Sequence, residues 1–182
     1  MNRPSLSPAT RVCDIDWDAW VPQQRCTLLF VIDREQERVL LIRKKRGLGG
    51  GLINGPGGRI DPGETAFDAA IRETHEELLI TPRAPSHRGE IHFQFIDGLA
   101  LSVAVFTSYQ FEGTPQETEE AIPIWAPMDN PPFDEMWEDD RIWLPEVLGG
   151  KHVDGRAIFD KAKMIDHDFR FSQANEAWTS GG

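Results

Sequence analysis

The chain has 182 residues, with 30 acidic residues against 19 basic ones and a formal net charge of -11. This length fits one domain with tails and is long enough to bury a core of its own. The negative charge argues against binding to a nucleic-acid polymer, for which a broad basic surface is expected. A polyanionic substrate would therefore need a metal ion between itself and the protein.

No targeting or membrane-spanning signal stands out along the chain. Residues 1–20 contain no apolar core typical of a signal peptide, and the longest apolar run, residues 28–32, is too short to cross a bilayer. Cys13 and Cys26 have neither metal-site nor redox-motif spacing, which favours ordinary thiols in a reducing compartment. We therefore expect a cytoplasmic monomer that does not bind membranes.

The first predicted elements are strands followed by an irregular segment. Within residues 27–44, two apolar runs flank the polar stretch 34–37, which indicates an antiparallel pair of strands. The glycine-rich segment 45–58 is expected to be irregular chain that can approach a ligand closely. It leads directly into a helix predicted within residues 57–80.

Strands are predicted again beyond this helix. Residues 90–96 and 99–106 are expected to form a hairpin, because Asp97 and Gly98 separate them at the spacing of a tight turn. A short extended piece is expected at residues 121–128. The sequence thus places further strands after the helix.

The C-terminal part is predicted to hold one helix and one more hairpin. A helix of two turns is expected to end at Gly149, with Pro145 kinking or breaking it. Residues 151–159 are predicted to be a hairpin that turns on Asp154 and Gly155.

The order of strands and helices predicts a mixed α/β sandwich. We expect a single domain over residues 21–172, with mobile segments at residues 1–20 and 173–182.

The predicted helix carries an unusual group of acids. At helical spacing Glu73, Glu76 and Glu77 fall opposite an apolar stripe that is expected to face the sheet. Charged helix faces are most often simply solvated. However, like charges at this spacing repel, whereas Mg²⁺ or Mn²⁺ favours clustered carboxylate oxygens. Metal-assisted phosphate chemistry is the leading hypothesis. The members of the stripe are Phe67, Ile71, Thr74 and Leu78.

The spacing of these acids resembles the Nudix box, the signature of hydrolases that cleave nucleoside diphosphates linked to another moiety. The matching positions are Gly58, Glu64, Arg72, Glu73, Glu76, Glu77 and Ile80. The resemblance implies an α/β/α sandwich with a mixed sheet and a loop-helix-loop formed by the box. Thr74 stands where an aliphatic residue is usual. Leu79 stands where a glycine commonly allows a left-handed helix end, so we expect a different helix exit here.

The resemblance also implies roles in the reaction. The expected Mg²⁺ ligands, with Mn²⁺ as the alternative metal, are the carboxylates of Glu73, Glu76 and Glu77 and the carbonyl of Gly57. Arg72 and Glu64 are expected to orient these ligands. Glu73 and Glu120 are both candidates for the general base that removes a proton from the attacking water.

A wider resemblance, over residues 24–160, is to the human-type MutT homologues, which hydrolyse oxidised purine nucleoside triphosphates such as 8-oxo-dGTP and 2-hydroxy-dATP. The stretches "KKRG", "NGPGG", "GTPQETEE" and "WEDD" carry it. It implies that Asn54, Asp139 and Asp140 bind the polar edge of the base and that Trp137 stacks on it. The remaining pocket residues that it implies are Thr27, Lys44, Phe93 and Phe95.

Several of these residues have a simpler interpretation. An aspartate before a helix often caps it, and Trp137 would fit a core. In a closed pocket, Asp139 and Asp140 would instead titrate as a coupled pair that shares one proton. We hypothesise that moving this proton lets one pocket accept both oxidised guanine and oxidised adenine. The residues Leu48, Ile53 and Ala121 replace larger side chains of the family and are expected to leave the pocket roomier.

The sequence therefore predicts a Mg²⁺-dependent hydrolase that converts oxidised purine nucleoside triphosphates to monophosphate plus pyrophosphate. Its partner would be a small-molecule nucleotide, and its role the cleansing of the nucleotide pool. Two alternatives stay open, a hydrolase of ADP-ribose or dinucleoside polyphosphates and a Nudix-fold sensor that binds without cleaving. The intact glutamate set counts against the sensor.

Overall fold

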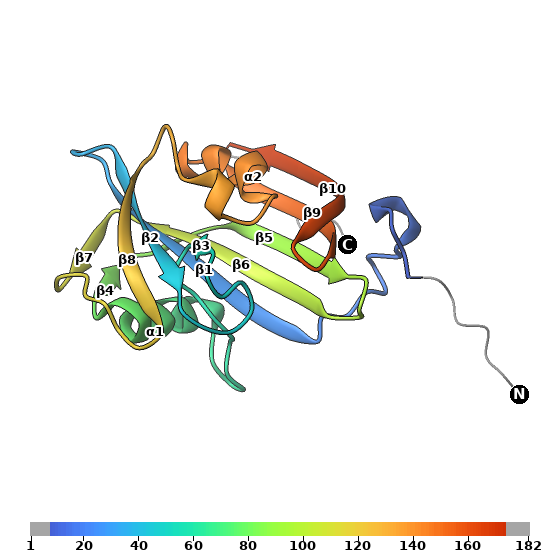
Figure 1. Ribbon diagram of the computed structural model, residues 1–182, viewed down its shortest axis with the longest axis horizontal. Coiled ribbons are helices and arrows are strands. Elements are labelled where there is room, and N and C mark those ends of the chain that lie inside the picture. The colour runs from blue at the N-terminus through green and yellow to red at the C-terminus, as the bar shows by residue number, and fades with distance from the viewer. Residues whose placement is uncertain (1–7, 174–182) are drawn as a thin grey trace, which may run out of the picture.

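The computed structural model describes residues 8–173 and arranges them in three layers (Figure 1). A mixed eight-stranded sheet forms the middle layer, and the helices α1 (Ala66–Leu78) and α2 (Asp140–Leu148) lie on its opposite faces. The predicted α/β sandwich with a mixed sheet is thus confirmed. Neither of these helices combines the length and the apolar character that crossing a membrane requires, a finding that covers residues 8–173.

The strands of the large sheet follow the order β10-β9-β5-β6-β1-β2, and both β3 and β8 pair with β2. The β1–β6 and β5–β9 pairs are parallel, and the other pairs are antiparallel. A separate two-stranded sheet pairs β4 with β7. The bounds of the strands and of the two 3-10 helices are β1 (Gln24–Asp33), β2 (Arg38–Lys44), β3 (Ile53–Asn54), β4 (Thr81–Arg83), β5 (Ser86–Phe95), β6 (Ala100–Ser108), β7 (Gln110–Glu112), β8 (Ala121–Pro127), β9 (His152–Asp160), β10 (Lys163–Ser172), η1 (Val12–Asp14) and η2 (Phe133–Glu135).

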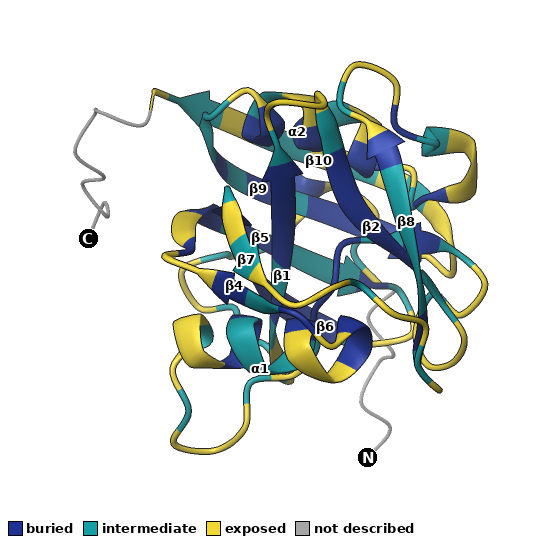
Figure 2. Cartoon of the chain, turned by 90° about the vertical axis from the view of Figure 1, so that its left-hand side faces the viewer, coloured by how far each residue is buried: buried dark blue, intermediate teal, exposed yellow. Residues whose placement is uncertain are grey.

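The core has two halves because β1 is covered on both faces. Phe30 packs in the cluster that contains Trp143 of α2, whereas Leu29 packs in the cluster that contains Leu78 of α1. A strand buried on both faces has a continuous apolar run instead of an alternating pattern. Figure 2 accordingly shows the centre of β1 in the colour of buried residues.

A glycine-rich stretch, residues 55–59, inserts beside β1 and is called the glycine wedge below. β1 and β2 pair directly only next to their hairpin. Further along β1, the Leu29 N–H donates to the Pro56 oxygen and the Thr27 N–H to the Gly58 oxygen, both at 2.9 Å. On the other side of the glycine wedge lies α1, since the Gly57 N–H donates to Glu77 at 2.9 Å. The glycine wedge therefore connects the sheet with the acidic helix.

Most elements near the site agree with the sequence predictions. The β1–β2 and β5–β6 hairpins are confirmed, and the second turns at Gly98 with a φ of 101°. The predicted helices correspond to α1 and α2, and the extended piece at residues 121–128 corresponds to β8. Pro145 lies inside α2 without ending it, because the helix continues to Leu148.

The hairpin predicted at residues 151–159 is wrong, because β9 runs straight through Gly155. A Cβ atom at this position would lie 2.5 Å from a ring carbon of Phe169, so the glycine makes room for an aromatic ring of β10. The actual turn follows β9, where Lys161 has a φ of 55°. β10 was not predicted.

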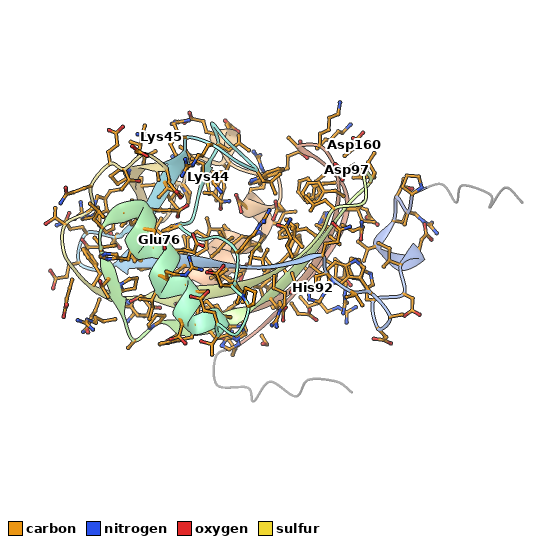
Figure 3. All side chains as sticks on the ribbon, turned by 90° about the horizontal axis from the view of Figure 1, so that it is seen from below. Lys44, Lys45, Glu76, His92, Asp97 and Asp160 are labelled. Atoms are coloured by element: carbon orange, nitrogen blue, oxygen red, sulfur yellow. The ribbon has the colours of Figure 1, made fainter. Side chains whose placement is uncertain are left out.

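Part of the N-terminal segment packs on the sheet. The rings of Trp20 and His92 stack with centroids 4.8 Å apart, and the Trp20 indole donates to Gln94 at 2.8 Å. Figure 3 shows His92 near this segment, at a distance from Lys44 and Glu76. The expected mobility of residues 1–20 and 173–182 stays a prediction, and residues 1–7 and 174–182 lie outside the described residues. The domain boundary at residue 21 stays a prediction.

The end of α1 differs from our expectation. Leu79 takes the left-handed conformation, with φ 58° and ψ 30°, and its N–H donates to the His75 oxygen at 2.8 Å. The expected change of helix exit is therefore wrong, because the leucine adopts the conformation that a glycine would take. This backbone costs an L-residue about 1 kcal/mol or more.

Replacing Leu79 with glycine is expected to give a protein about 1 kcal/mol more stable than Leu79→Ala, because only glycine avoids the left-handed strain. Both variants lose the same side chain, which is 43% exposed, so their comparison isolates the backbone. Equilibrium unfolding in urea measures the difference. Equal stability of the two variants would contradict the strain.

Candidate active site

The loop before α1 fixes Glu64 in place. The Thr65 hydroxyl caps α1 by accepting from the Asp68 N–H at 3.1 Å. Glu64 precedes the cap, and its carboxylate accepts from the Asp61 N–H at 3.0 Å. The loop thus holds this acid toward the middle of the helix.

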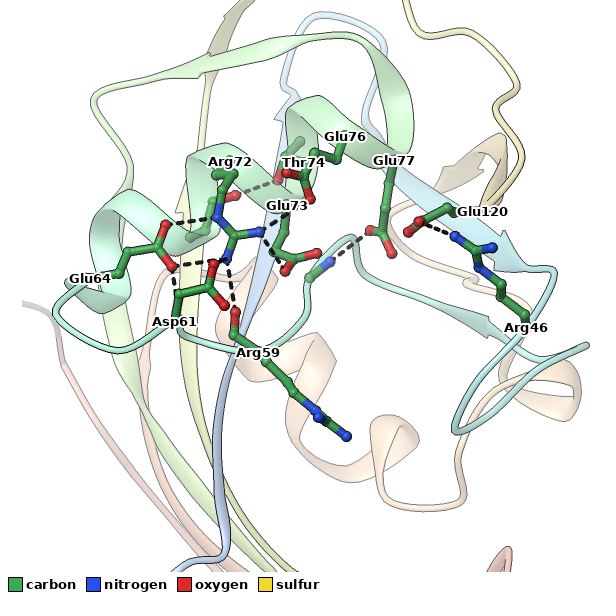
Figure 4. Close-up of polar contacts among 12 residues, drawn as sticks. Arg46, Arg59, Asp61, Glu64, Arg72, Glu73, Thr74, Glu76, Glu77 and Glu120 are labelled. Atoms are coloured by element: carbon green, nitrogen blue, oxygen red, sulfur yellow. Dashed lines mark hydrogen bonds and ion pairs between the residues drawn. The ribbon is translucent and has the colours of Figure 1, made fainter.

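Arg72 is the centre of the polar network (Figure 4). Its guanidinium donates to both oxygens of Glu64 at 2.8 and 2.9 Å, to Glu73 at 2.8 Å and to Glu76 at 3.1 Å. It also donates to the Arg59 carbonyl at 2.9 Å. These bonds lower the pKa of Glu64 to about 2. One guanidinium thus offsets the like-charge repulsion that the sequence predicted.

Glu77 is buried, with only 3% of its surface exposed. Burial raises the pKa of Glu77 to about 8, although the Gly57 N–H and the charge of Lys44 act in the opposite direction. Burial also raises the pKa of Glu73. A solvated acidic face does not describe these residues, and the expectation that Glu77 lies opposite the packed face is wrong.

The packed face of α1 is rotated from the expected stripe. Phe67 is 42% exposed, whereas Thr74 is buried and its hydroxyl donates to the Ala70 oxygen at 2.7 Å. Thr74 therefore fits this face, because its polar atom is satisfied within the helix. The buried residues of α1 are Ala69, Ala70, Thr74, Glu77 and Leu78.

The acid cluster (Glu73, Glu76 and Glu77) has the chemistry of a divalent-cation site. Within residues 8–173 no three acidic, histidine or cysteine side chains come close enough together to hold a metal. Arg72 holds Glu73 and Glu76, and the Gly57 N–H holds Glu77. All the available ligands are oxygens, which hard divalent cations prefer. The chemistry of these ligands therefore suits such a cation, although the described side chains are not gathered around a common point.

Glu120 faces the same region from the loop before β8. Its negative charge raises the pKa of Glu73 and of Glu77, so it lies near both. Its carboxylate forms an ion pair with Arg46 (Figure 4). The neighbouring Lys45 donates to Glu117 at 2.6 Å. Two ion pairs thus join the loop after β2 to the loop before β8.

A pocket of about 330 Å³ opens beside the glycine wedge. All the side chains predicted to bind substrate line it, namely Thr27, Lys44, Asn54, Phe93, Phe95, Trp137, Asp139 and Asp140. The structure therefore brings together residues that come from distant parts of the chain. The sequence did not point to the lining residues Gln24, Cys26, Arg59, Leu101, Val103 and Phe159. The alternation of β1 and β6 could have indicated some of these.

Two aspartates with very little exposed surface line one part of the pocket. Asp139 and Asp140 are each 2% exposed. The Asp139 carboxylate accepts from the Trp143 indole at 2.8 Å and makes no capping bond to α2. Burial raises the pKa of Asp139 to about 6, and burial with the charge of Asp139 raises the pKa of Asp140 well above its usual value. The pair therefore retains a proton more readily than free carboxyls do.

Two further polar features point toward a ligand. The Thr27 hydroxyl and the Asp140 Oδ2 atom are buried and have no hydrogen-bond partner in the part of the chain that the structure describes. The side-chain oxygen of Asn54, Oδ1, accepts from the Gly55 N–H at 2.8 Å. This leaves the side-chain NH₂ group of Asn54 to donate. Buried polar atoms without partners are costly, so a ligand would offset this cost.

Aromatic rings form another part of the wall. Trp137 meets Phe95 and Phe159 edge to face, with centroids 6.2 and 5.5 Å apart. Trp137 is half-buried, so it is not simply a core residue, whereas Trp143 is fully buried. An exposed ring face can stack on a flat ligand.

The expected enlargement of the pocket applies to one of its three residues. Leu48 lines the pocket and is 49% exposed. Ile53 packs instead in the core beneath α2, and Ala121 packs in the core beneath α1. The expectation is therefore wrong for Ile53 and Ala121.

The comparisons with known proteins identify the family. The NUDIX domain family matches residues 22–147. The chain belongs to the NUDIX family. It is 38% identical over 146 residues to the oxidized purine nucleoside triphosphate hydrolase of Mus musculus, with 79% of this chain and 92% of the relative covered. The Danio rerio protein of the same name is 42% identical over 140 residues, with 76% and 88% covered.

The fold agrees with this family. The crystal structure of the mutator MutT protein from Bacillus halodurans superposes with a TM-score of 0.70 at 24% identity, covering 80% of this chain and 97% of that one. NUDIX hydrolases generally use divalent metal ions, which matches the oxygen ligands of the acid cluster.

Two adjacent glycines of the NUDIX site are expected to respond differently to alanine. Gly57→Ala should destabilise the fold by about 2 kcal/mol or more, because its Cβ would overlap the backbone oxygen of Thr27. Gly58→Ala should cost less, because its Cβ meets the movable carboxylate of Glu73. Urea unfolding of both variants tests this order. A larger loss for Gly58→Ala would contradict it.

Proposed function

We propose that this protein is a Mg²⁺-dependent pyrophosphohydrolase of oxidised purine nucleoside triphosphates such as 8-oxo-dGTP. It would release the monophosphate and pyrophosphate and so keep damaged nucleotides out of DNA. The observation that carries the proposal is the position of the glycine wedge. Gly57 and Gly58 line the pocket, and the same residues meet Glu77 and Glu73 of α1. The names of the Mus musculus and Danio rerio relatives support this substrate class.

The acid cluster and the Gly57 carbonyl would hold the metal, with Mn²⁺ as an alternative to Mg²⁺. Bound metal neutralises phosphate charge and lowers the pKa of an attacking water. Arg72 and Glu64 position the carboxylates, as their mutual bonds at 2.8 and 2.9 Å suggest. The acids thereby keep one orientation instead of repelling one another.

Glu73 and Glu120 remain the two candidates for the general base. Burial raises the pKa of Glu73, which brings a carboxylate closer to the range in which it accepts protons well. Glu120 lies on a separate loop and pairs with Arg46. Glu73 belongs to the acid cluster, and the charge of Glu120 acts on Glu73 and Glu77, so either could take a proton from a water there.

Lys44 and Arg59 are the cations among the residues that line the pocket. In a chain with a net charge of -11, these two cations would attract phosphate groups to the pocket. Lys44 also lies near Glu77, since its charge lowers the pKa of that residue. We infer that Lys44 holds the phosphates near the acid cluster.

The base would bind at the acidic end of the pocket. Asn54 offers its NH₂ group to a carbonyl of the base, and the aspartate pair combines an acceptor with a protonated donor. Trp137 supplies a ring for stacking, and Phe93 and Phe95 close the wall. The unpartnered Asp140 oxygen supports a polar ligand at this end.

Turnover with Mg²⁺, followed by chromatography as loss of the substrate and appearance of its nucleotide products, is expected to be faster for 8-oxo-dGTP than for dGTP, ADP-ribose or diadenosine tetraphosphate. Glu76→Gln should lower this turnover more than the roughly 10- to 100-fold loss typical of residues behind the metal ligands. The matched control is Glu119→Gln, which changes an exposed acid outside the cluster. No turnover of any substrate would refute the enzyme, and a preference for ADP-ribose would refute the substrate assignment.

Asp139→Asn and Asp140→Asn are expected to change the preference between 8-oxo-dGTP and 2-hydroxy-dATP by about 10-fold or more, because each fixes one donor and acceptor pattern. The ratio of kcat/KM values for the two substrates measures the change. Glu138→Gln, at the exposed neighbouring position, is the control. If both asparagine variants keep the wild-type ratio, the shared proton has no part in selectivity.

A further inference from the structure

The wall of the pocket carries a free thiol that the proposed reaction does not use. Cys26 lies on β1, half-buried, and lines the pocket. Strand alternation places it on the same face as Leu28, and both pack against the aromatic cluster around Phe159. The other cysteine, Cys13, is exposed in η1. The chain thus has one thiol in the pocket and one outside it.

The surroundings of Cys26 combine an apolar wall with positive charge. Arg59 and Lys44 line the same pocket. Burial raises the pKa of the Cys26 thiol and so does the charge of Glu73, whereas the charges of Arg59 and Lys44 lower it. A flat anionic molecule would therefore find both aromatic contacts and cations here. Slow reaction at neutral pH is expected, because the thiolate is the reactive form.

An independent observation shows that this pocket is built for a ligand. Asp140 lines the same pocket, and its Oδ2 atom is buried and has no hydrogen-bond partner among the described residues. Asp140 is only 2% exposed. A group attached to Cys26 would enter the pocket that this carboxyl lines.

We propose that Cys26 is a modification site at which an anionic, thiol-reactive small molecule closes the nucleotide pocket. The inference rests on the proposed function only in requiring that the pocket bind a nucleotide. It gives the protein a means of inhibition by mixed disulfide formation. Reduction of the disulfide would reopen the pocket.

The chemistry can be followed with dithiobis(nitrobenzoate), an aromatic and anionic disulfide. The Cys26 thiol loses its proton to solvent, and its sulfur attacks one sulfur of the reagent. The bond between the reagent sulfurs breaks as a bond between Cys26 and one nitrothiobenzoate forms. The second nitrothiobenzoate leaves as a coloured thiolate, so the absorbance counts the modified thiols.

The test uses the full chain with the substitution Cys13→Ser, which leaves only the pocket thiol. We expect one released nitrothiobenzoate per chain, loss of 8-oxo-dGMP binding in proportion to labelling, and recovery of binding with a reducing agent. With 8-oxo-dGMP at a hundred times its Kd, labelling should slow by about 100-fold, because bound nucleotide covers the thiol. Intact mass and isothermal titration measure labelling and binding.

The matched control is Cys26→Ser, which keeps the exposed Cys13. It should take up label while its nucleotide affinity, whatever its starting value, does not change on labelling. Labelled Cys13→Ser that binds 8-oxo-dGMP as before would overturn the inference, as would a labelling rate that nucleotide does not slow. A thiol that reacts only after unfolding in urea would also overturn it.

These readouts need no turnover, so the two proposals can fail separately. If nucleotide protects Cys26 and labelling blocks binding while no substrate is hydrolysed, the modification site stands and the proposed reaction fails. If substrates are hydrolysed while labelling leaves binding intact, the reaction stands and the modification site fails.

Discussion

The bonds of the Arg72 guanidinium are the interaction on which the rest of the site depends. A single side chain joins the loop before α1, through Glu64 and the Arg59 carbonyl, to the middle of the helix, through Glu73 and Glu76. The planar guanidinium can make these bonds at once because its five N–H groups point in fixed directions, which a lysine could not reproduce. Without this cation, the acids of one helix would repel one another. The same Arg72 bonds therefore fix both the orientation of the loop against α1 and the positions of the acids.

The glycine wedge explains why the pocket and the acid cluster lie next to each other. β1 and β2 pair directly only near their hairpin, and the glycine wedge takes the free edge of β1. A side chain at position 57 would overlap the backbone of Thr27, and one at position 58 would meet the carboxylate of Glu73. Gly57 and Gly58 consequently separate the pocket from the acid cluster, because they line the pocket and also meet Glu77 and Glu73. A nucleotide held at Asp139 and Asn54 would extend its phosphates along this wall.

The sequence predicted the parts of this arrangement that local spacing and family resemblance determine. The β1–β2 and β5–β6 hairpins, α1 and the lining of the pocket follow from turn residues, helical spacing and matching motifs. Features that depend on contacts between distant segments could not be predicted from local sequence patterns. The buried carboxylate of Glu77 accepts from the glycine wedge, which is distant in sequence. Gly155 is not in a turn, because a side chain there would collide with the ring of Phe169 on the neighbouring strand. Leu79 adopts a left-handed conformation at the end of α1 although its residue type does not indicate it.

The strands after residue 147 belong to the same folded unit as the residues of the family match. The NUDIX match ends at residue 147, yet β9 pairs along the whole inner part of β5 and brings Phe159 to the pocket. A fragment cut at the limits of the match would leave β5 as an open edge with unpaired N–H and C=O groups, a template for association with other chains. It would also lose Trp20 from the other face of β5. The folded unit is thus wider than the family match at both ends, and a fragment limited to residues 22–147 would lack one wall of the pocket.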